Sequence, residues 1–158
     1  MTLTLIDGRS GSGKTSYARR LAAADGTRVL HMDDIYEGWH GMAIGTATLE
    51  RLLTEQAAGR VARWQNWDWY ADDWGPGQEL RPGESLIVEG CGSVTAVTAA
   101  LAGRVIWLEA PESIRHERAL ERDGDDSWWE LWKRQEAVHL AEHDPRSLAT
   151  EIVDTADC

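Results

Sequence analysis

The sequence from Gly8 to Thr15 reads Gly-Arg-Ser-Gly-Ser-Gly-Lys-Thr and fits the pattern G-x-x-x-x-G-K-[S/T]. The segment in front of it, residues 3–7, is apolar and β-branched, which predicts a buried strand. The segment behind it, residues 15–24, is rich in Ala, Leu and Arg, which predicts a helix. A phosphate-binding loop requires the order strand, glycine loop, helix, so the context supports the motif.

The chemistry of this loop points to a nucleoside triphosphate. Glycines allow backbone conformations that a Cβ atom forbids, so the loop can fold over an anion and point its N–H groups inward. The helix N-terminus adds partial positive charge. Lys14 would supply a cation for the β- and γ-phosphates, and Thr15 a hydroxyl for Mg²⁺. We therefore expect ATP and Mg²⁺ as cofactors, with nucleotide contacts from Gly8, Ser10, Gly11, Ser12, Gly13, Lys14, Thr15 and Ser16.

Composition narrows the class of protein. The chain has 158 residues, which suits one domain, and a net charge of −11. This acidity disfavours a nucleic-acid polymer as partner, because binding to a phosphate backbone needs a basic surface. No segment approaches the roughly 20 apolar residues of a membrane span, and Cys91 and Cys158 form no disulfide or metal-binding pattern. The expectation is a cytoplasmic protein without a membrane partner; its oligomeric state stays open.

Alternating strands and helices predict the fold class. Five core strands are expected to begin near Leu3, Val29, Leu86, Val105 and Glu151. Most are joined by helical segments, including one from Thr46 or Thr48 to about Ala58. This alternation predicts an α/β protein with a parallel sheet and helices on both faces, a three-layer sandwich. One further strand is expected over residues 61–67, and it leads into a tryptophan-rich segment that ends at Gly77.

The second core strand ends in Asp33-Asp34-Ile35-Tyr36, which resembles the D-x-[FY]-Y element of uridine kinase-like P-loop kinases. The resemblance implies that Asp33 is the catalytic base and that Tyr36 helps to hold the acceptor. An aspartate suits this task, because the base mainly orients the acceptor hydroxyl and takes its proton late. Asp34 remains an alternative base, and either residue could instead cap the next helix or turn.

The third core strand ends in Leu86-Ile87-Val88-Glu89-Gly90, which resembles the apolar strand with a terminal Glu-Gly in the same family. The resemblance implies that Glu89 acts at Mg²⁺ together with Thr15, directly or through water. Few protein ligands and several waters are what Mg²⁺ prefers. The alternative is that Glu89 caps a helix beginning near Ser93.

After the fourth strand, Pro111 opens a helix with Arg115, Arg118 and Arg122 on one face. This arrangement resembles the lid of the kinase superfamily, in which arginines stabilise charge on the transferring phosphoryl group. Arg118 and Arg122 are the favoured catalytic candidates. The alternative is a solvated face on which the arginines pair with neighbouring glutamates.

A tryptophan-rich stretch over residues 64–77 is the candidate acceptor site. Aromatic faces stack on planar rings, and carboxylates accept hydrogen bonds from hydroxyls. We expect Trp69 to line the pocket and Asp68 to grip a sugar-like diol, beside Asp33 and Tyr36. Core packing of these tryptophans is the alternative. A neutral polyol or nucleoside fits the segment better than a phosphorylated acceptor, although Arg51, Arg60 and Arg81 keep the latter open.

The resemblance to P-loop kinases covers almost the whole chain. It implies core strands in the order 2-3-1-4-5 and a single kinase domain over residues 1–158, with an acceptor-binding insert at about 36–80 and a helical lid at about 115–135. The function it implies is ATP-dependent phosphoryl transfer to a hydroxyl of a small molecule, most similar to a uridine kinase. The alternatives are a nucleoside monophosphate, shikimate- or gluconate-type kinase, or an ATP-binding NTPase or regulatory module without an acceptor.

Overall fold

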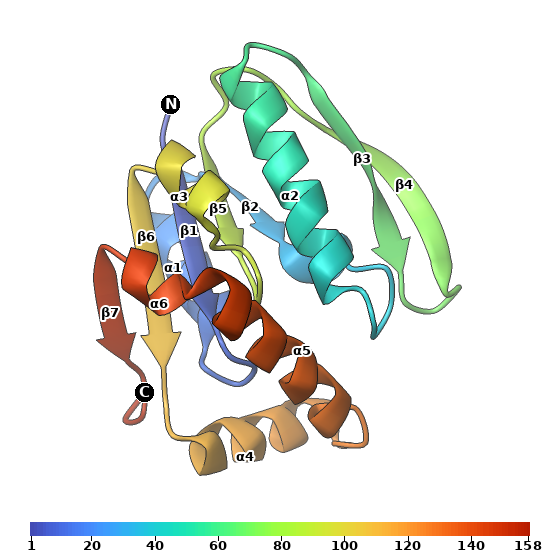
Figure 1. Cartoon of the computed structure of the whole chain (residues 1–158), viewed down its shortest axis with the longest axis vertical. Coiled ribbons are helices and arrows are strands. Elements are labelled where there is room, and N and C mark those ends of the chain that lie inside the picture. Colours follow the sequence, from blue (N-terminus) through green and yellow to red (C-terminus); the bar gives the residue numbers. More distant parts are fainter.

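A five-stranded parallel sheet forms the centre of the computed structural model, which describes residues 1–158 (Figure 1). The strands lie in the order β2-β5-β1-β6-β7 and comprise β1 (Leu3–Gly8), β2 (Arg28–His31), β5 (Leu86–Glu89), β6 (Arg104–Glu109) and β7 (Glu151–Asp154). Counted among the core strands alone, this order is 2-3-1-4-5; along the whole chain the labels differ because an additional hairpin takes β3 and β4. The parallel α/β sheet is confirmed.

Helices cover both faces of the sheet. Neighbouring residues of each strand point to opposite faces, so the apolar strands supply side chains to a core on each side. On one side, Ile6 and Ile106 pack with Ala18 of α1. On the other side, Leu5 belongs to a larger core that includes Leu52 of α2. The helices are α1 (Lys14–Asp25), α2 (Met42–Ala57), α3 (Ala96–Leu101), α4 (Glu112–Asp123), α5 (Trp129–His143) and α6 (Pro145–Leu148), with a 3₁₀ turn η1 (Met32–Asp34).

Helix α2 begins one turn earlier than the sequence suggested. Met42 is buried in the larger core, and this burial stabilises the additional turn. Thr46 does not cap the helix; its hydroxyl donates a hydrogen bond to the carbonyl of Gly92 at 2.8 Å. None of the helices combines the length and the apolar character that crossing a membrane requires.

The segment predicted to bind the acceptor contains an antiparallel hairpin of β3 (Ala62–Asp68) and β4 (Asp73–Leu80), which extends beside α2 (Figure 1). No strand was predicted from the sequence for the residues of β4. Half of these residues are exposed and β4 pairs on one edge only, where proline and glycine are tolerated. Ala62 and Leu80 fix the base of the hairpin in the core.

Candidate active site

The loop between β1 and α1 is built on glycines for two reasons. A Cβ atom on Gly8 would collide with the carbonyl oxygen of Leu108, and one on Gly11 would collide with the backbone of Arg115. Gly13 faces open space, but its φ of +93° is a left-handed conformation that favours glycine. The loop can therefore lie against β6 and α4 while turning sharply into α1.

The backbone N–H groups at the start of α1 are available to a ligand. Those of Gly13, Lys14, Thr15 and Ser16 donate no hydrogen bond within the protein, as is typical of a helix N-terminus. They border a cavity of about 1080 Å³. The predicted nucleotide contacts that line this cavity are Ser10, Gly11, Gly13, Lys14, Thr15 and Ser16.

Two predicted contacts, Gly8 and Ser12, do not line the cavity. The Ser12 N–H donates to the carbonyl of Arg9 at 3.1 Å, and its carbonyl accepts a hydrogen bond from the Thr155 hydroxyl at 2.7 Å. The N–H of Ser10 is also occupied, since it donates to the Glu136 carboxylate at 2.5 Å. Ser10 and Ser12 therefore shape the loop through internal hydrogen bonds.

Lys14 is buried beneath the loop and stays positively charged. Its Nζ donates to the carbonyl of Arg9 at 3.0 Å. Burial alone lowers the pKa of Lys14, but surrounding anionic groups, among them the carboxylates of Glu89 and Glu136, outweigh burial and raise it. A cation held in this way suits a phosphate ligand.

Thr15 and Glu89 meet at the strand tips, as the sequence predicted. The Thr15 hydroxyl donates to Glu89 Oε1 at 3.2 Å. The same oxygen lies 2.6 Å from Nδ1 of His31, and this hydrogen bond is the main reason why the pKa of His31 is raised. A hydroxyl and a carboxylate oxygen at this separation fit Mg²⁺, which takes hard oxygen ligands and keeps several waters. His31 was not singled out from the sequence.

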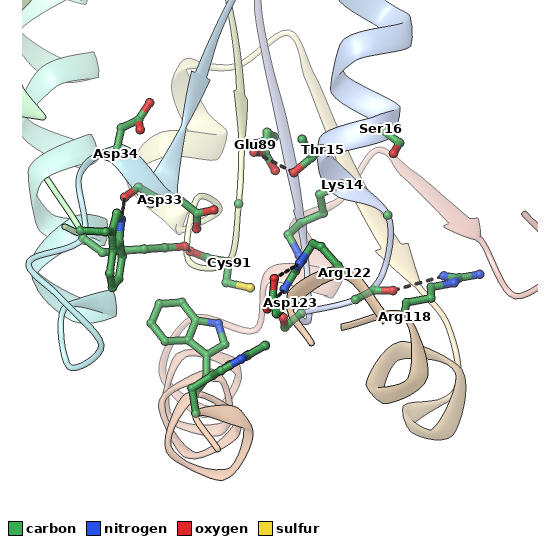
Figure 2. Close-up of a pocket in the computed structure, with 18 of the residues that line it drawn as sticks. Lys14, Thr15, Ser16, Asp33, Asp34, Glu89, Cys91, Arg118, Arg122 and Asp123 are labelled. Atoms are coloured by element: carbon green, nitrogen blue, oxygen red, sulfur yellow. Dashed lines mark hydrogen bonds and ion pairs between the residues drawn. The ribbon is translucent and has the colours of Figure 1, made fainter. Parts of the chain in front are cut away.

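Asp33 lies in η1, directly after β2, and directs its carboxylate toward the middle of the cavity, whereas the carboxylate of Asp34 points away from it (Figure 2). The surrounding protein removes water from the Asp33 carboxylate and so raises its pKa, and the negative charge of Glu89 raises this pKa further. The positive charges of Lys14 and Arg122 act in the opposite direction. The backbone carbonyl of Asp33 accepts a hydrogen bond from Nε1 of Trp69 at 2.9 Å. The hairpin turn therefore positions the backbone of the candidate base.

The other predicted acceptor contacts have different surroundings. Trp69 lines the cavity, as expected. Tyr36 also borders it, but its hydroxyl is buried and donates to the carbonyl of Cys91, so it is not available to an acceptor. Asp68 lies outside the cavity and accepts hydrogen bonds from the N–H groups of Tyr70 and Ala71 at 2.9 and 3.0 Å. It caps the hairpin turn, which corrects its expected position.

The three arginines of α4 have three different environments. Arg115 is buried and donates to the carbonyls of Ala110 and Ser10. Arg118 donates to the carbonyl of Gly11 at 3.2 Å and extends away from the centre of the cavity (Figure 2). Arg122 lines the cavity and is paired with Asp123, whose hydrogen bonds raise the pKa of Arg122. Among the two favoured candidates, Arg122 is better placed to reach a phosphate.

Residues that the sequence did not mark as site residues complete the cavity. Trp39, in the loop after η1, and Trp128 and Trp132, at the start of α5, line it together with Trp69. The sequence signal for Trp39 was its position shortly after Asp33. Trp128 and Trp132 lie about one helical turn apart, a spacing that is equally typical of core packing. Nothing in the sequence marked Glu136, since only the fold brings α5 to the loop.

Comparisons with known proteins identify the family and the fold. A family model described as "AAA domain" matches residues 5–136. No curated protein sequence matches the chain. Among solved structures, one described as a possible uridine kinase from Bacillus stearothermophilus is 20% identical, with a TM-score of 0.64 and coverage of 97% of this chain and 88% of that chain.

Two further structures share the fold. A gluconokinase from Sinorhizobium meliloti 1021 is 20% identical, with a TM-score of 0.59 and coverage of 99% and 84% of the two chains. A shikimate kinase from Acinetobacter baumannii in complex with shikimate is 18% identical, with a TM-score of 0.57 and coverage of 100% and 86%. At these identities the likeness shows the fold, and the predicted resemblance to P-loop kinases is confirmed at that level.

Proposed function

Since the chain belongs to the AAA domain family of P-loop proteins, we propose that it is an ATP-dependent kinase that phosphorylates a hydroxyl of a small molecule. In this proposal residues 1–158 form one kinase domain, with the acceptor insert at about 36–80 and the lid at about 115–135. The observation that carries it is that Lys14, Asp33 and the Thr15–Glu89 pair all border one cavity.

Each part of the cavity has a task in this reaction. The free amides at the start of α1 and the Lys14 ammonium hold the β- and γ-phosphates. Thr15 and Glu89 hold Mg²⁺, which neutralises phosphate charge when bound. Arg122 exchanges Asp123 for the transferring phosphoryl group and stabilises its charge.

Asp33 orients the acceptor hydroxyl and takes its proton. A bond forms between the acceptor oxygen and the γ-phosphorus while the bond from that phosphorus to the β,γ-bridging oxygen breaks, so ADP leaves. The finer interpretation, a nucleoside or similar acceptor as in a uridine kinase, draws on the Asp33–Tyr36 and Leu86–Gly90 motifs. A regulatory ATP-binding module would have no use for an acceptor-facing carboxylate.

The test is ADP release by the purified chain with Mg·ATP across a panel of hydroxyl compounds. Lys14→Ala should abolish transfer with the fold intact, whereas Lys133→Ala, which changes the only other lysine, should not. Asp33→Asn should lower kcat by about 10²–10⁴-fold with little change in ATP affinity.

Asp34→Asn is the matched control for Asp33→Asn. If Asp34→Asn causes the larger loss, the base is Asp34. Two results together would contradict the kinase proposal. The chain would bind ATP but hydrolyse it slowly, with no acceleration by any acceptor, and Lys14→Ala would behave like the unmodified chain.

A further inference from the structure

The charges that line the cavity are divided between its two sides. All of its cations come from α1 and α4: Lys14, Arg19, Arg118 and Arg122. The opposite side is formed by η1, the loop after it, the hairpin turn and the start of α5, and it contributes no lysine, arginine or histidine. The side that faces the phosphate loop is therefore acidic and aromatic.

Four residues on this side form a continuous aromatic surface, which we call the tryptophan wall (Trp39, Trp69, Trp128 and Trp132). The Trp39 ring stacks on Trp128 with 5.5 Å between centroids. It meets Trp69 edge to face at 5.0 Å and Trp132 at 6.3 Å. Although it is central to the wall, Trp39 remains 45% exposed, so a large apolar ring is open to a ligand in the cavity.

The wall already contacts one cation. The guanidinium of Arg122 lies 5.9 Å from the ring of Trp128, within the range in which an aromatic face attracts a positive charge. In the proposed reaction Arg122 and Lys14 attend the phosphates. The Asp33 carboxylate forms no hydrogen bond with a protein group, and Lys14 and Arg122 act on its charge only through space.

An anionic acceptor against the wall would meet only Arg122, which attends the phosphates in the proposed reaction, whereas a positively charged acceptor would meet aromatic faces and the Asp33 carboxylate. We propose that the acceptor is a hydroxyl compound with a positively charged nitrogen, an amino alcohol or amino sugar. Its hydroxyl lies at Asp33 and its cation against the tryptophan wall. This inference rests on the proposed function, which it deepens by naming the class of acceptor.

The decisive comparison uses two probes of equal shape. Choline and 3,3-dimethylbutan-1-ol differ only in a quaternary nitrogen in place of a quaternary carbon. Calorimetric titration in the presence of Mg·ADP should show that choline binds at least about tenfold more tightly than its neutral isostere. Gluconate should bind more weakly than glucose, because the gluconate carboxylate would lie near the carboxylate of Asp33. Equal or weaker binding of choline, no binding of either probe, or tighter binding of uridine overturns the inference.

Variants assign the preference to the wall. Trp39→Leu should lower the ratio of choline affinity to isostere affinity several-fold. Tyr70→Leu removes a fully exposed aromatic side chain outside the cavity and should leave the ratio unchanged. An unaltered ratio in Trp39→Leu overturns the assignment. Phosphoryl transfer is measured separately by ADP release. If the chain prefers choline to its neutral isostere in binding but transfers no phosphoryl group, the proposed function is contradicted. If it transfers a phosphoryl group without this preference, the present inference is contradicted.

Discussion

Replacing Glu136 by glutamine tests how α5 holds the phosphate loop. One carboxylate oxygen of Glu136 accepts a hydrogen bond from the N–H of Ser10 at 2.5 Å, and the other accepts one from Nε of Arg9 at 3.3 Å. Both Glu136 and Ser10 are buried. Glutamine has almost the same shape but only one acceptor oxygen, so one of the two donors would face its NH₂ group.

The expected cost follows from the lost bond. A hydrogen bond to a charged group contributes about 1.5–3 kcal/mol to stability. Arg9 is partly exposed and can turn to solvent, which favours the middle of this range, about 2 kcal/mol. For a domain of this size 1 kcal/mol shifts Tm by about 2–4 °C, so Glu136→Gln should lower Tm by about 4–8 °C. Because Ser10 belongs to the loop, KM for ATP should rise more than kcat falls.

Thermal unfolding followed by calorimetry, with and without Mg·ADP, measures both effects. Glu142→Gln is the matched control, since Glu142 lies on the same helix with an exposed side chain and should change stability by less than about 0.5 kcal/mol. If Glu136→Gln kept the Tm and the KM for ATP of the unmodified chain, Glu136 would not hold the loop.

Two further predictions concern the acceptor side of the cavity. Because surrounding protein and Glu89 raise the pKa of Asp33, kcat/KM should fall with decreasing pH around a midpoint above the ordinary aspartate value of about 3.9; a pH–rate profile with its midpoint at or below that value would contradict the assignment of the base. Tyr36→Phe removes the hydroxyl that donates to the buried carbonyl of Cys91, so it should cost about 1–3 kcal/mol of stability and leave KM for the acceptor unchanged. Denaturant unfolding and steady-state kinetics measure the two effects. A raised KM at unchanged stability would return Tyr36 to the acceptor site.

Local patterns in the sequence were sufficient for the sheet and for the phosphate side of the site. The glycine loop between an apolar strand and a helix has one useful geometry, and it places Lys14 and Thr15 without reference to the rest of the chain. Parallel strands end at the same edge of a sheet, so acids after β2 and β5 could be expected to face that loop. Asp33 and Glu89 do line the cavity.

The acceptor side depended on contacts between segments far apart in the chain. The tryptophan wall joins residues 39, 69, 128 and 132, and Glu136 reaches Ser10 across 126 positions. Spacing along the sequence carries no information on such meetings, because they follow from how helices and the hairpin pack over the sheet. Tyr36 and Asp68 show the same limit, since their types suit ligand binding but their hydrogen bonds are used within the protein. The sequence by itself determined where phosphate chemistry could occur; only tertiary packing decided which side chains remained free to meet the second ligand.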